Sequence, residues 1–275
     1  MTFQVMPWMI ALLPVSLVLL RQFSSFYYRT LMTTLSMIVM ATYGMIVALL
    51  FPLVGCTHYI HFTVARGYYY LGLLFCGIQV VPEGIENLNV QGPAILVCNH
   101  QSSLDIMLMG KVYPKNTTII AKKELKYYPF LGWFMQLSRV IFLDRKNREN
   151  AIKEARKAAE DIHKKNVNVW VFPEGTRGHE SEINLLPFKK GPFYMAVQAK
   201  VPIIPIVIAN YSHLYSAKEK KYQPGVVRCK ILPPISTETI EEESTSIEKL
   251  ATDCRQQMLD VLKDITPIET VKKTQ

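Results

Sequence analysis

The chain has 275 residues, of which 49% are hydrophobic, with a formal net charge of +9 and five cysteines. This length allows one α/β domain and a further segment. The positive charge alone would suit nucleic acid, but no zinc-finger spacing, RNP-like motif or basic heptad accompanies it. We therefore expect no nucleic-acid partner, and instead an anionic membrane surface and phosphorylated substrates. An odd cysteine number without a C-x-x-C pair indicates free thiols.

Apolar residues are concentrated near the N-terminus. Residues 5–20 and 31–55 are each long enough to cross most or all of the hydrocarbon core of a bilayer, and Arg21 and Arg29 lie between them. A helical hairpin in the membrane is the simplest interpretation. A cleavable signal peptide is a weaker alternative for the first segment, because it lacks a basic n-region and a clear cleavage site.

A third apolar stretch, residues 56–81, contains Arg66, two histidines and three consecutive tyrosines. It is long enough to span, but these residues favour a helix that lies in the membrane interface and leads into the next domain. Pro82 and Gly84 then predict a domain boundary. We expect residues 1–82 to be membrane-anchoring helices and residues 83–275 to be a catalytic domain.

Short apolar runs alternate with amphipathic segments in the second domain. An amphipathic helix is predicted over residues 151–164, and a C-terminal packing helix over residues 247–265, preceded by a Thr245-x-x-Glu248 capping box. This alternation predicts an α/β fold with a mixed, largely parallel sheet flanked by helices. The predicted strands are residues 94–98, 117–121, 140–143, 167–172, 203–208 and 226–232.

His100 and Asp105 directly follow the first of these strands. If a tight turn joins the strand to a helix over residues 104–109, with Ser102 or Ser103 as its N-cap, the two side chains can meet. A carboxylate that accepts a hydrogen bond from one ring nitrogen leaves the other nitrogen free as a general base. A structural cap or a surface polar pair is the alternative for such a pair taken alone.

Charged side chains also follow three other predicted strands. Because ligands of α/β sheets bind beyond the carboxyl ends of the strands, these groups can converge with His100 on one site. Arginine is suited to binding a phosphate by two parallel hydrogen bonds. Taken singly, these groups could instead form a surface turn with an ion pair or a basic patch facing the membrane. They are Lys122 and Lys123, Arg145, and Glu174 with Arg177.

Four sequence blocks together resemble those of the 1-acylglycerol-3-phosphate acyltransferases (lysophosphatidic acid acyltransferases) of the glycerolipid acyltransferase superfamily. The block Asn99 to Asp105 is similar to the N-H-x-x-x-x-D motif of that family. Residues 122–132 with 142–145 are similar to the second block, residues 172–177 to the third and residues 201–206 to the fourth. The resemblance implies a glycerol-3-phosphate acyltransferase-like fold preceded by N-terminal membrane helices.

The resemblance implies transfer of an acyl group from acyl-CoA to the sn-2 hydroxyl of lysophosphatidic acid, which gives phosphatidic acid for phospholipid and triacylglycerol synthesis. Another lysophospholipid or glycerol-3-phosphate is the alternative acceptor. A thioester is already activated, so no protein nucleophile, metal or cofactor is expected. The implied roles are general base for His100 and orienting partner for Asp105. Binding of the glycerol phosphate falls to Arg145, Glu174, Gly175 and Arg177, helped by Lys122 or Lys123, with Asn99 and Ser103 as positioning groups.

Two other functions compete with this one. Cys98 and His100 face the same side of a strand, so an acyl-enzyme on Cys98 is conceivable, although Cys98 belongs to an apolar run. A membrane-shaping scaffold would fit the N-terminal segments but would not need His100 and Asp105. The ending Lys272-Lys273-Thr274-Gln275 resembles a dilysine retrieval signal. We therefore expect residence in the endoplasmic reticulum membrane with a cytosolic catalytic domain, lipid droplets as a second location, and no obligate protein partner.

Overall fold

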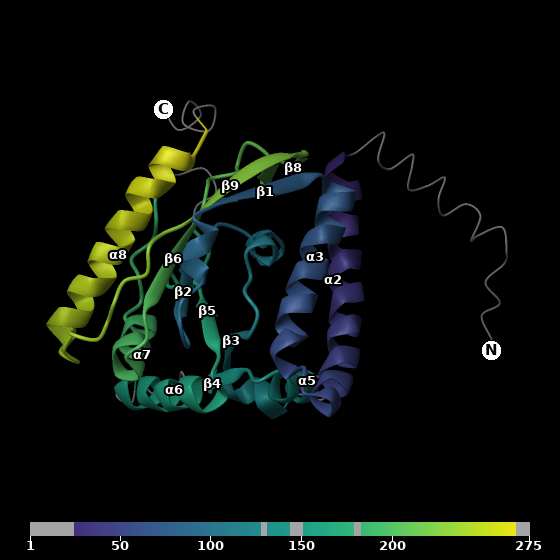
Figure 1. The fold of residues 1–275 in the computed structure, drawn as a ribbon. Coiled ribbons are helices and arrows are strands. Elements are labelled where there is room, and N and C mark those ends of the chain that lie inside the picture. The colour runs from purple at the N-terminus through teal and green to yellow at the C-terminus, as the bar shows by residue number, and fades with distance from the viewer. Residues whose placement is uncertain (1–24, 128–130, 144–150, 179–182, 268–275) are drawn as a thin grey trace.

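A seven-stranded sheet with the order β1-β9-β6-β2-β5-β3-β4 forms the centre of the molecule (Figure 1). The computed structural model describes residues 25–127, 131–143, 151–178 and 183–267. The strands of this sheet are β1 (Ile78–Glu83), β2 (Ile95–Cys98), β3 (Thr117–Lys122), β4 (Ile141–Leu143), β5 (Asn168–Val171), β6 (Ile203–Ile208) and β9 (Gly225–Ile231). Strands β7 (Tyr215–Ser216) and β8 (Lys221–Tyr222) form a separate antiparallel hairpin.

The sheet is largely parallel, as the sequence predicts. Strands β2 to β6 all run in one direction and β1 is parallel to β9, while β6 and β9 form the antiparallel pair. Every residue of β2 and of β6 is buried, because these central strands are covered on both faces. Their uninterrupted apolar sequences are the direct consequence, and they place the carboxyl end of β2 deep in the fold.

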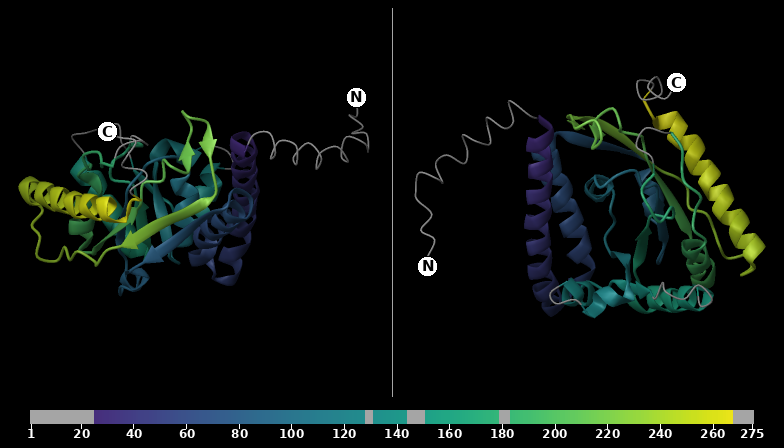
Figure 2. Two further views of the ribbon diagram at one scale, coloured as in Figure 1. Left: turned by 90° about the horizontal axis from the view of Figure 1, so that it is seen from above. Right: turned by 180° about the vertical axis from the view of Figure 1, so that it is seen from behind.

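Helices cover both faces of the sheet. Helix α3 contacts β1 and β3, whereas α7 and α8 contact β2, β6 and β9. Figure 2 shows α8 and the α2–α3 pair on opposite sides of the molecule. The α-helices are α2 (Ser25–Leu50), α3 (Ile60–Cys76), α4 (Asp105–Leu108), α5 (Leu131–Leu137), α6 (Ala151–Lys165), α7 (Gly191–Ala199) and α8 (Ser244–Ile265).

Five short 3-10 helices complete the described chain. Two of them join α2 to α3, and the others precede β2, extend α4 or follow β3. They are η1 (Phe51–Val54), η2 (Thr57–Tyr59), η3 (Ile85–Leu88), η4 (Met109–Lys111) and η5 (Lys123–Tyr127).

The α2 segment is a candidate membrane span. Residues 25–54 are long and apolar enough to cross a bilayer, and only 22% of their most hydrophobic window is buried in the protein. It is the one such helix among the described residues. The apolar helix expected over residues 31–55 is therefore present, whereas the segment expected over residues 5–20 lies outside the described residues. Helix α3 packs against α2, and Arg29 Nε at the start of α2 donates to Cys76 O at the end of α3 over 3.1 Å.

The structure corrects the interpretation of residues 56–81 as one interfacial helix. Helix α3 ends at Cys76, where Gly77 adopts a φ of 74° and its N–H donates to Leu73 O. The next residues form β1, so the boundary expected at Pro82 falls within a strand of the sheet. The polar residues of α3 bond to the protein itself. Arg66 donates to Lys111 O and Tyr113 O, and His61 Nε2 lies 2.9 Å from Ser138 O.

The C-terminal helix α8 is present, but the predicted capping box is not formed. Glu243 occupies the N-cap position with extended backbone, and its side chain makes no capping hydrogen bond. Glu248 instead lies 2.7 Å from Lys190 Nζ, because α7 packs beside this turn of α8. Besides β1, the short strands β7 and β8 were not predicted. All five cysteines are free, as expected.

Candidate active site

The loop after β2 brings His100 and Asp105 together. His100 Nδ1 lies 2.8 Å from Asp105 Oδ2, which confirms the contact predicted from their spacing. The Asp105 carboxylate is fully buried at the start of α4, whereas 15% of the His100 side chain is exposed. The geometry therefore leaves an accessible imidazole on a buried carboxylate.

Hydrogen bonds around Asp105 settle which ring nitrogen carries the proton. The backbone N–H groups of Gln101 and Ser102 donate to Oδ2 over 2.5 and 2.9 Å. The Tyr211 hydroxyl lies 2.6 Å from Oδ1. Because the Asp105 carboxylate accepts from every side, the tautomer of a neutral His100 that fits this geometry has its proton on Nδ1 and its lone pair on Nε2.

The serine N-cap expected for the following helix takes a different form. Leu104 occupies the N-cap position, and α4 is only four residues long. Ser102 Oγ accepts the Leu104 N–H over 3.0 Å, and Asp105 Oδ2 accepts the N–H groups of Gln101 and Ser102. The carboxylate that contacts His100 thus also closes this loop. Helix α4 is shorter than the helix predicted over residues 104–109.

Glu174 holds the His100 loop from the neighbouring strand β5. Its Oε1 accepts the His100 N–H over 2.8 Å, and its Oε2 accepts the Leu186 N–H over 2.9 Å. The residue is only 3% exposed, and burial raises the pKa of its carboxyl group, opposed by these two hydrogen bonds. We expected Glu174 to bind a substrate phosphate. Both oxygens are engaged by backbone N–H groups of the protein, and the phosphate-binding role stays a prediction.

The turn that carries Glu174 needs glycine. Gly175 has a φ of 72°, in the left-handed region that costs little only for glycine, and its N–H donates to Phe172 O over 3.2 Å. Gly178 N–H, three residues on, donates to His100 O over 2.8 Å. The Pro173 to Gly178 turn and the His100 loop are therefore joined at both backbone polar groups of His100.

Asn99 is entirely buried and serves the scaffold. Its Nδ2 donates to Ile208 O over 2.9 Å, and its Oδ1 accepts the Ile208 N–H over 2.8 Å. Both halves of the amide are thus used to fasten the end of β2 to the end of β6. This agrees with a positioning group rather than a group that touches a substrate.

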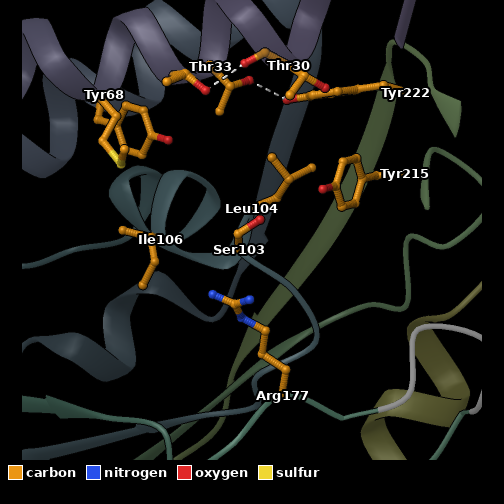
Figure 3. A pocket seen from close by; sticks show the side chains of 11 residues that line it. Thr30, Thr33, Tyr68, Ser103, Leu104, Ile106, Arg177, Tyr215 and Tyr222 are labelled. Atoms are coloured by element: carbon orange, nitrogen blue, oxygen red, sulfur yellow. Dashed lines mark hydrogen bonds between the residues drawn. The ribbon is translucent and has the colours of Figure 1, made fainter. Parts of the chain in front are cut away.

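Arg177 and Ser103 face one cavity of about 260 Å³ (Figure 3). The guanidinium points toward the loop that carries Ser103, and in the described part of the chain it makes no hydrogen bond or ion pair. Helix α2 supplies much of the opposite wall. The other lining residues are Thr30, Thr33, Thr34, Met37, Tyr68, Leu104, Ile106, Tyr215 and Tyr222. Figure 3 shows the Tyr215 hydroxyl pointing into the same space.

The remaining predicted site residues are not brought to this cavity by the described structure. Lys122 ends β3, on the same sheet edge as His100, and Lys123 is exposed on η5, where it lines a separate cavity with Phe142 and Lys157. Arg145 lies outside the described residues. No three His, Cys, Asp or Glu side chains within the described ranges group as ligands for a metal ion.

Sequence comparison identifies relatives over most of the chain. The sequence model of a family described as Acyltransferase matches residues 79–209. The Saccharomyces cerevisiae protein named 1-acyl-sn-glycerol-3-phosphate acyltransferase is 43% identical over 240 residues, 87% of this chain and 78% of that protein. The alpha 1-acyl-sn-glycerol-3-phosphate acyltransferase of Mus musculus is 41% identical over 191 residues, 69% of this chain and 66% of that protein.

The fold also matches a solved structure. The crystal structure of the 1-acyl-sn-glycerophosphate (LPA) acyltransferase PlsC from Thermotoga maritima aligns with a TM-score of 0.62 and 25% identity, covering 86% of this chain and 97% of that one. Fold and site thus define an α/β acyltransferase that carries an apolar N-terminal helix. The chain belongs to the family of 1-acyl-sn-glycerol-3-phosphate acyltransferases.

Sequence reasoning missed several residues that build this site. Phe172 stacks on the His100 ring, with ring centroids 4.2 Å apart and an angle of 21° between the planes. Tyr211 bonds to Asp105, and Tyr215 and Tyr222 come from the β7–β8 hairpin. Phe172 is the first residue of the third sequence block but was assigned no role, whereas the tyrosines reach the site only through long-range contacts for which the local sequence carries no signal.

Proposed function

We propose that the protein transfers an acyl group from acyl-CoA to the sn-2 hydroxyl of lysophosphatidic acid, producing phosphatidic acid. The observation that carries this proposal is the His100–Asp105 pair, which lies beside Arg177, a guanidinium that has no partner among the described residues. The names of the relatives support the choice of acceptor. The donor and the residue roles rest on the chemistry of the site.

The His100 imidazole acts as the general base. Asp105 holds Nδ1–H, so Nε2 takes the proton of the sn-2 hydroxyl as its oxygen attacks the thioester carbonyl carbon. The tetrahedral intermediate collapses with cleavage of the C–S bond, and the proton on Nε2 passes to the departing CoA sulfur. Donor and acceptor bound at one site supply the further advantage of proximity.

Arg177 is the side chain that we assign to the acceptor phosphate. It is unpaired in the described structure, and its planar guanidinium matches a phosphate bidentately. Ser103 faces the same cavity and can add a hydroxyl donor. We retain Arg145, Lys122 and Lys123 as further phosphate-binding candidates. Glu174, Gly175 and Asn99 act instead by fixing the His100 loop.

The acceptor reaches the site from the membrane. The cavity is lined on one side by Thr30, Thr33 and Met37 of α2, whose outward face exposes Ile38, Val39 and other large apolar side chains. An amphiphile with its chain beside α2 and its phosphate at Arg177 would contact matching chemistry at both ends. We propose residence in the endoplasmic reticulum membrane, with the catalytic domain cytosolic and lipid droplets as a second location. Masking Lys272 and Lys273 tests this, and an unchanged distribution would remove its support.

A panel of acceptors at fixed acyl-CoA tests the reaction. The full-length protein in detergent should convert labelled oleoyl-CoA and lysophosphatidic acid to phosphatidic acid, and the H100A variant should not. Glycerol-3-phosphate, lysophosphatidylcholine and monoacylglycerol should be poorer acceptors. A lack of acyl-CoA-dependent product with every acceptor would refute the enzyme proposal, and preference for another acceptor would move it to that lipid.

A further inference from the structure

Tyr211 closes a hydrogen-bond chain that ends at His100. Its hydroxyl lies 2.6 Å from Asp105 Oδ1 and 2.8 Å from Ser102 Oγ, and the residue is only 2% exposed. Tyr211 follows β6, whereas Ser102 and Asp105 follow β2. The contact therefore joins loops separated by 106 positions in the sequence.

The direction of each hydrogen bond in this chain is determined. The Tyr211 hydroxyl donates to Asp105 Oδ1. With its proton engaged there, the Tyr211 oxygen is left as acceptor for the Ser102 hydroxyl, whose own oxygen accepts the Leu104 N–H. The chain runs from Leu104 through Ser102 and Tyr211 to the carboxylate that orients the imidazole.

We propose that Tyr211 is a positioning residue of the reaction, acting through Asp105. The N–H groups of Gln101 and Ser102 and the His100 ring all converge on Oδ2, whereas the Tyr211 hydroxyl donates to Oδ1. Without this hydrogen bond, the Asp105 carboxylate can rotate about its Cβ–Cγ bond. Oδ2 is then no longer held against His100 Nδ1. This proposal rests on the proposed function for its kinetic consequence.

The surrounding loops are built to hold Tyr211 in place. Asn99 makes two hydrogen bonds to Ile208 of β6, and Gln101 Nε2 donates to Ile208 O and Ala209 O over 3.0 and 3.2 Å. The His100 loop is thus fastened to the residues directly before Tyr211. A phenol placed on such a fixed platform can restrain the carboxylate, because its own position is restrained.

Tyr113 offers a matched control. It is buried to the same degree, at 1% exposure, but its hydroxyl has no hydrogen-bond partner in the described part of the chain. Replacing either tyrosine by phenylalanine removes one buried hydroxyl group and leaves the aromatic ring in place. Only the Tyr211→Phe change removes a bond to the catalytic pair.

The test compares Y211F and Y113F in the full-length protein in detergent. We expect Y211F to lower kcat about tenfold, with the KM values of acyl-CoA and lysophosphatidic acid within about twofold of the parent, because Tyr211 touches neither substrate. Y113F should match the parent. In a D105N background, Y211F should change kcat less than about twofold, since its effect passes through Asp105.

A second readout does not depend on turnover. In protein labelled with 15N-histidine, the ring shifts of His100 at neutral pH should report a proton on Nδ1 in the parent and in Y113F, and a mixture of tautomers in Y211F. An unchanged tautomer, or a kcat equal to the parent, would overturn the proposal. If the parent itself lacks activity, the proposed function fails. The His100 tautomer in Y211F then tests by itself whether Tyr211 acts through Asp105. If Y211F does not fold, S102A should shift the tautomer in the same direction, and an unchanged tautomer would refute the chain.

Discussion

The Phe172 ring lies flat against the imidazole of His100, with centroids 4.2 Å apart and planes at 21°. Asp105 restrains His100 through Nδ1, Glu174 and Gly178 through its backbone, and Phe172 through the ring face. These restraints come from the two neighbouring parallel strands β2 and β5. The position of the His100 side chain is thus fixed jointly by the loops that follow β2 and β5.

Loss of the stacking contact between Phe172 and His100 should lower kcat measurably. Phe172→Leu keeps an apolar side chain but not the flat contact, so we expect kcat to fall about tenfold with little change in KM. Phe188→Leu is the control, because Phe188 is also partly buried and stacks on Phe193, away from His100. Equal kcat losses in the two variants would show that the effect is general packing. Steady-state kinetics at saturating acyl-CoA measures the difference.

Replacement of Glu174 by glutamine tests whether this residue positions the base. The amide keeps one acceptor and presents a donor to a backbone N–H, so one of the two bonds to His100 and Leu186 is lost. We expect a loss of about 1–3 kcal/mol in unfolding free energy and a lower kcat, with the KM of lysophosphatidic acid unchanged. A KM effect without a kcat effect would instead place Glu174 beside the substrate phosphate.

Arg177 should determine binding of the phosphate. Arg177→Ala removes a charged donor and should raise the KM of lysophosphatidic acid by about 10- to 100-fold, corresponding to about 1.5–3 kcal/mol. Arg177→Lys should recover only part, because lysine lacks the bidentate fork. Arg228→Ala is the control, since Arg228 is an exposed arginine of β9 that pairs with Glu83 of the neighbouring strand β1. The losses should vanish for monoacylglycerol, and an equal loss there would argue against phosphate recognition.

Cys98 should be dispensable for turnover. Its thiol is fully buried in β2, and burial raises the pKa of the thiol well above its usual value, so the nucleophilic thiolate is not formed. Cys98→Ala should retain most of kcat and cost on the order of 1 kcal/mol of stability through the small void. H100A in parallel should abolish activity. Comparable loss in C98A, with trapping of an acyl-thioester in the parent, would support the acyl-enzyme route.

His61 should make stability depend on pH. Burial lowers the pKa of His61 from 6.5 to about 4, and the hydrogen bond to Ser138 O only partly opposes this. The unfolded chain therefore binds a proton that the folded protein excludes, so stability is retained above pH 6.5 and is lost as the pH falls toward 4. At 1.36 kcal/mol per pKa unit, the loss is on the order of 3 kcal/mol.

His61→Gln removes this titration while keeping a donor for Ser138. Thermal unfolding in detergent between pH 7.5 and pH 4.5 should show a smaller decline for H61Q than for the parent. His163→Gln, at an exposed position of α6, is the control and should follow the parent. Parallel curves for all three proteins would show that other groups govern the acid sensitivity.

Local patterns decided much of the fold. The apolar runs predict all six of the strands that they were assigned to, with β6 at its observed bounds, and the spacing of His100 and Asp105 predicts their contact. Both results have the same reason. Strand burial and a turn of five residues depend on neighbours in the sequence, so they are encoded within a few residues.

The elements that were missed depend on partners elsewhere in the chain. In the sequence, β1 looks like the continuation of an apolar helix, because only Gly77 interrupts the apolar run. The segment forms a strand because it pairs with β9, about 145 residues away. The polar residues of α3 suggested a membrane interface, whereas Arg66 and His61 bond to carbonyl groups of the folded domain.

By itself, the sequence determined the family blocks, the largely parallel sheet, an apolar N-terminal helix and the contact between His100 and Asp105. Only the tertiary structure decided that Glu174 and Asn99 turn inward to hold the His100 loop, that Arg177 and Ser103 share a cavity with α2, and that Tyr211 completes the bonding of Asp105. These roles are set by which backbone and side-chain groups meet at the carboxyl ends of adjacent strands. That adjacency follows from the strand order, which residue types alone do not specify.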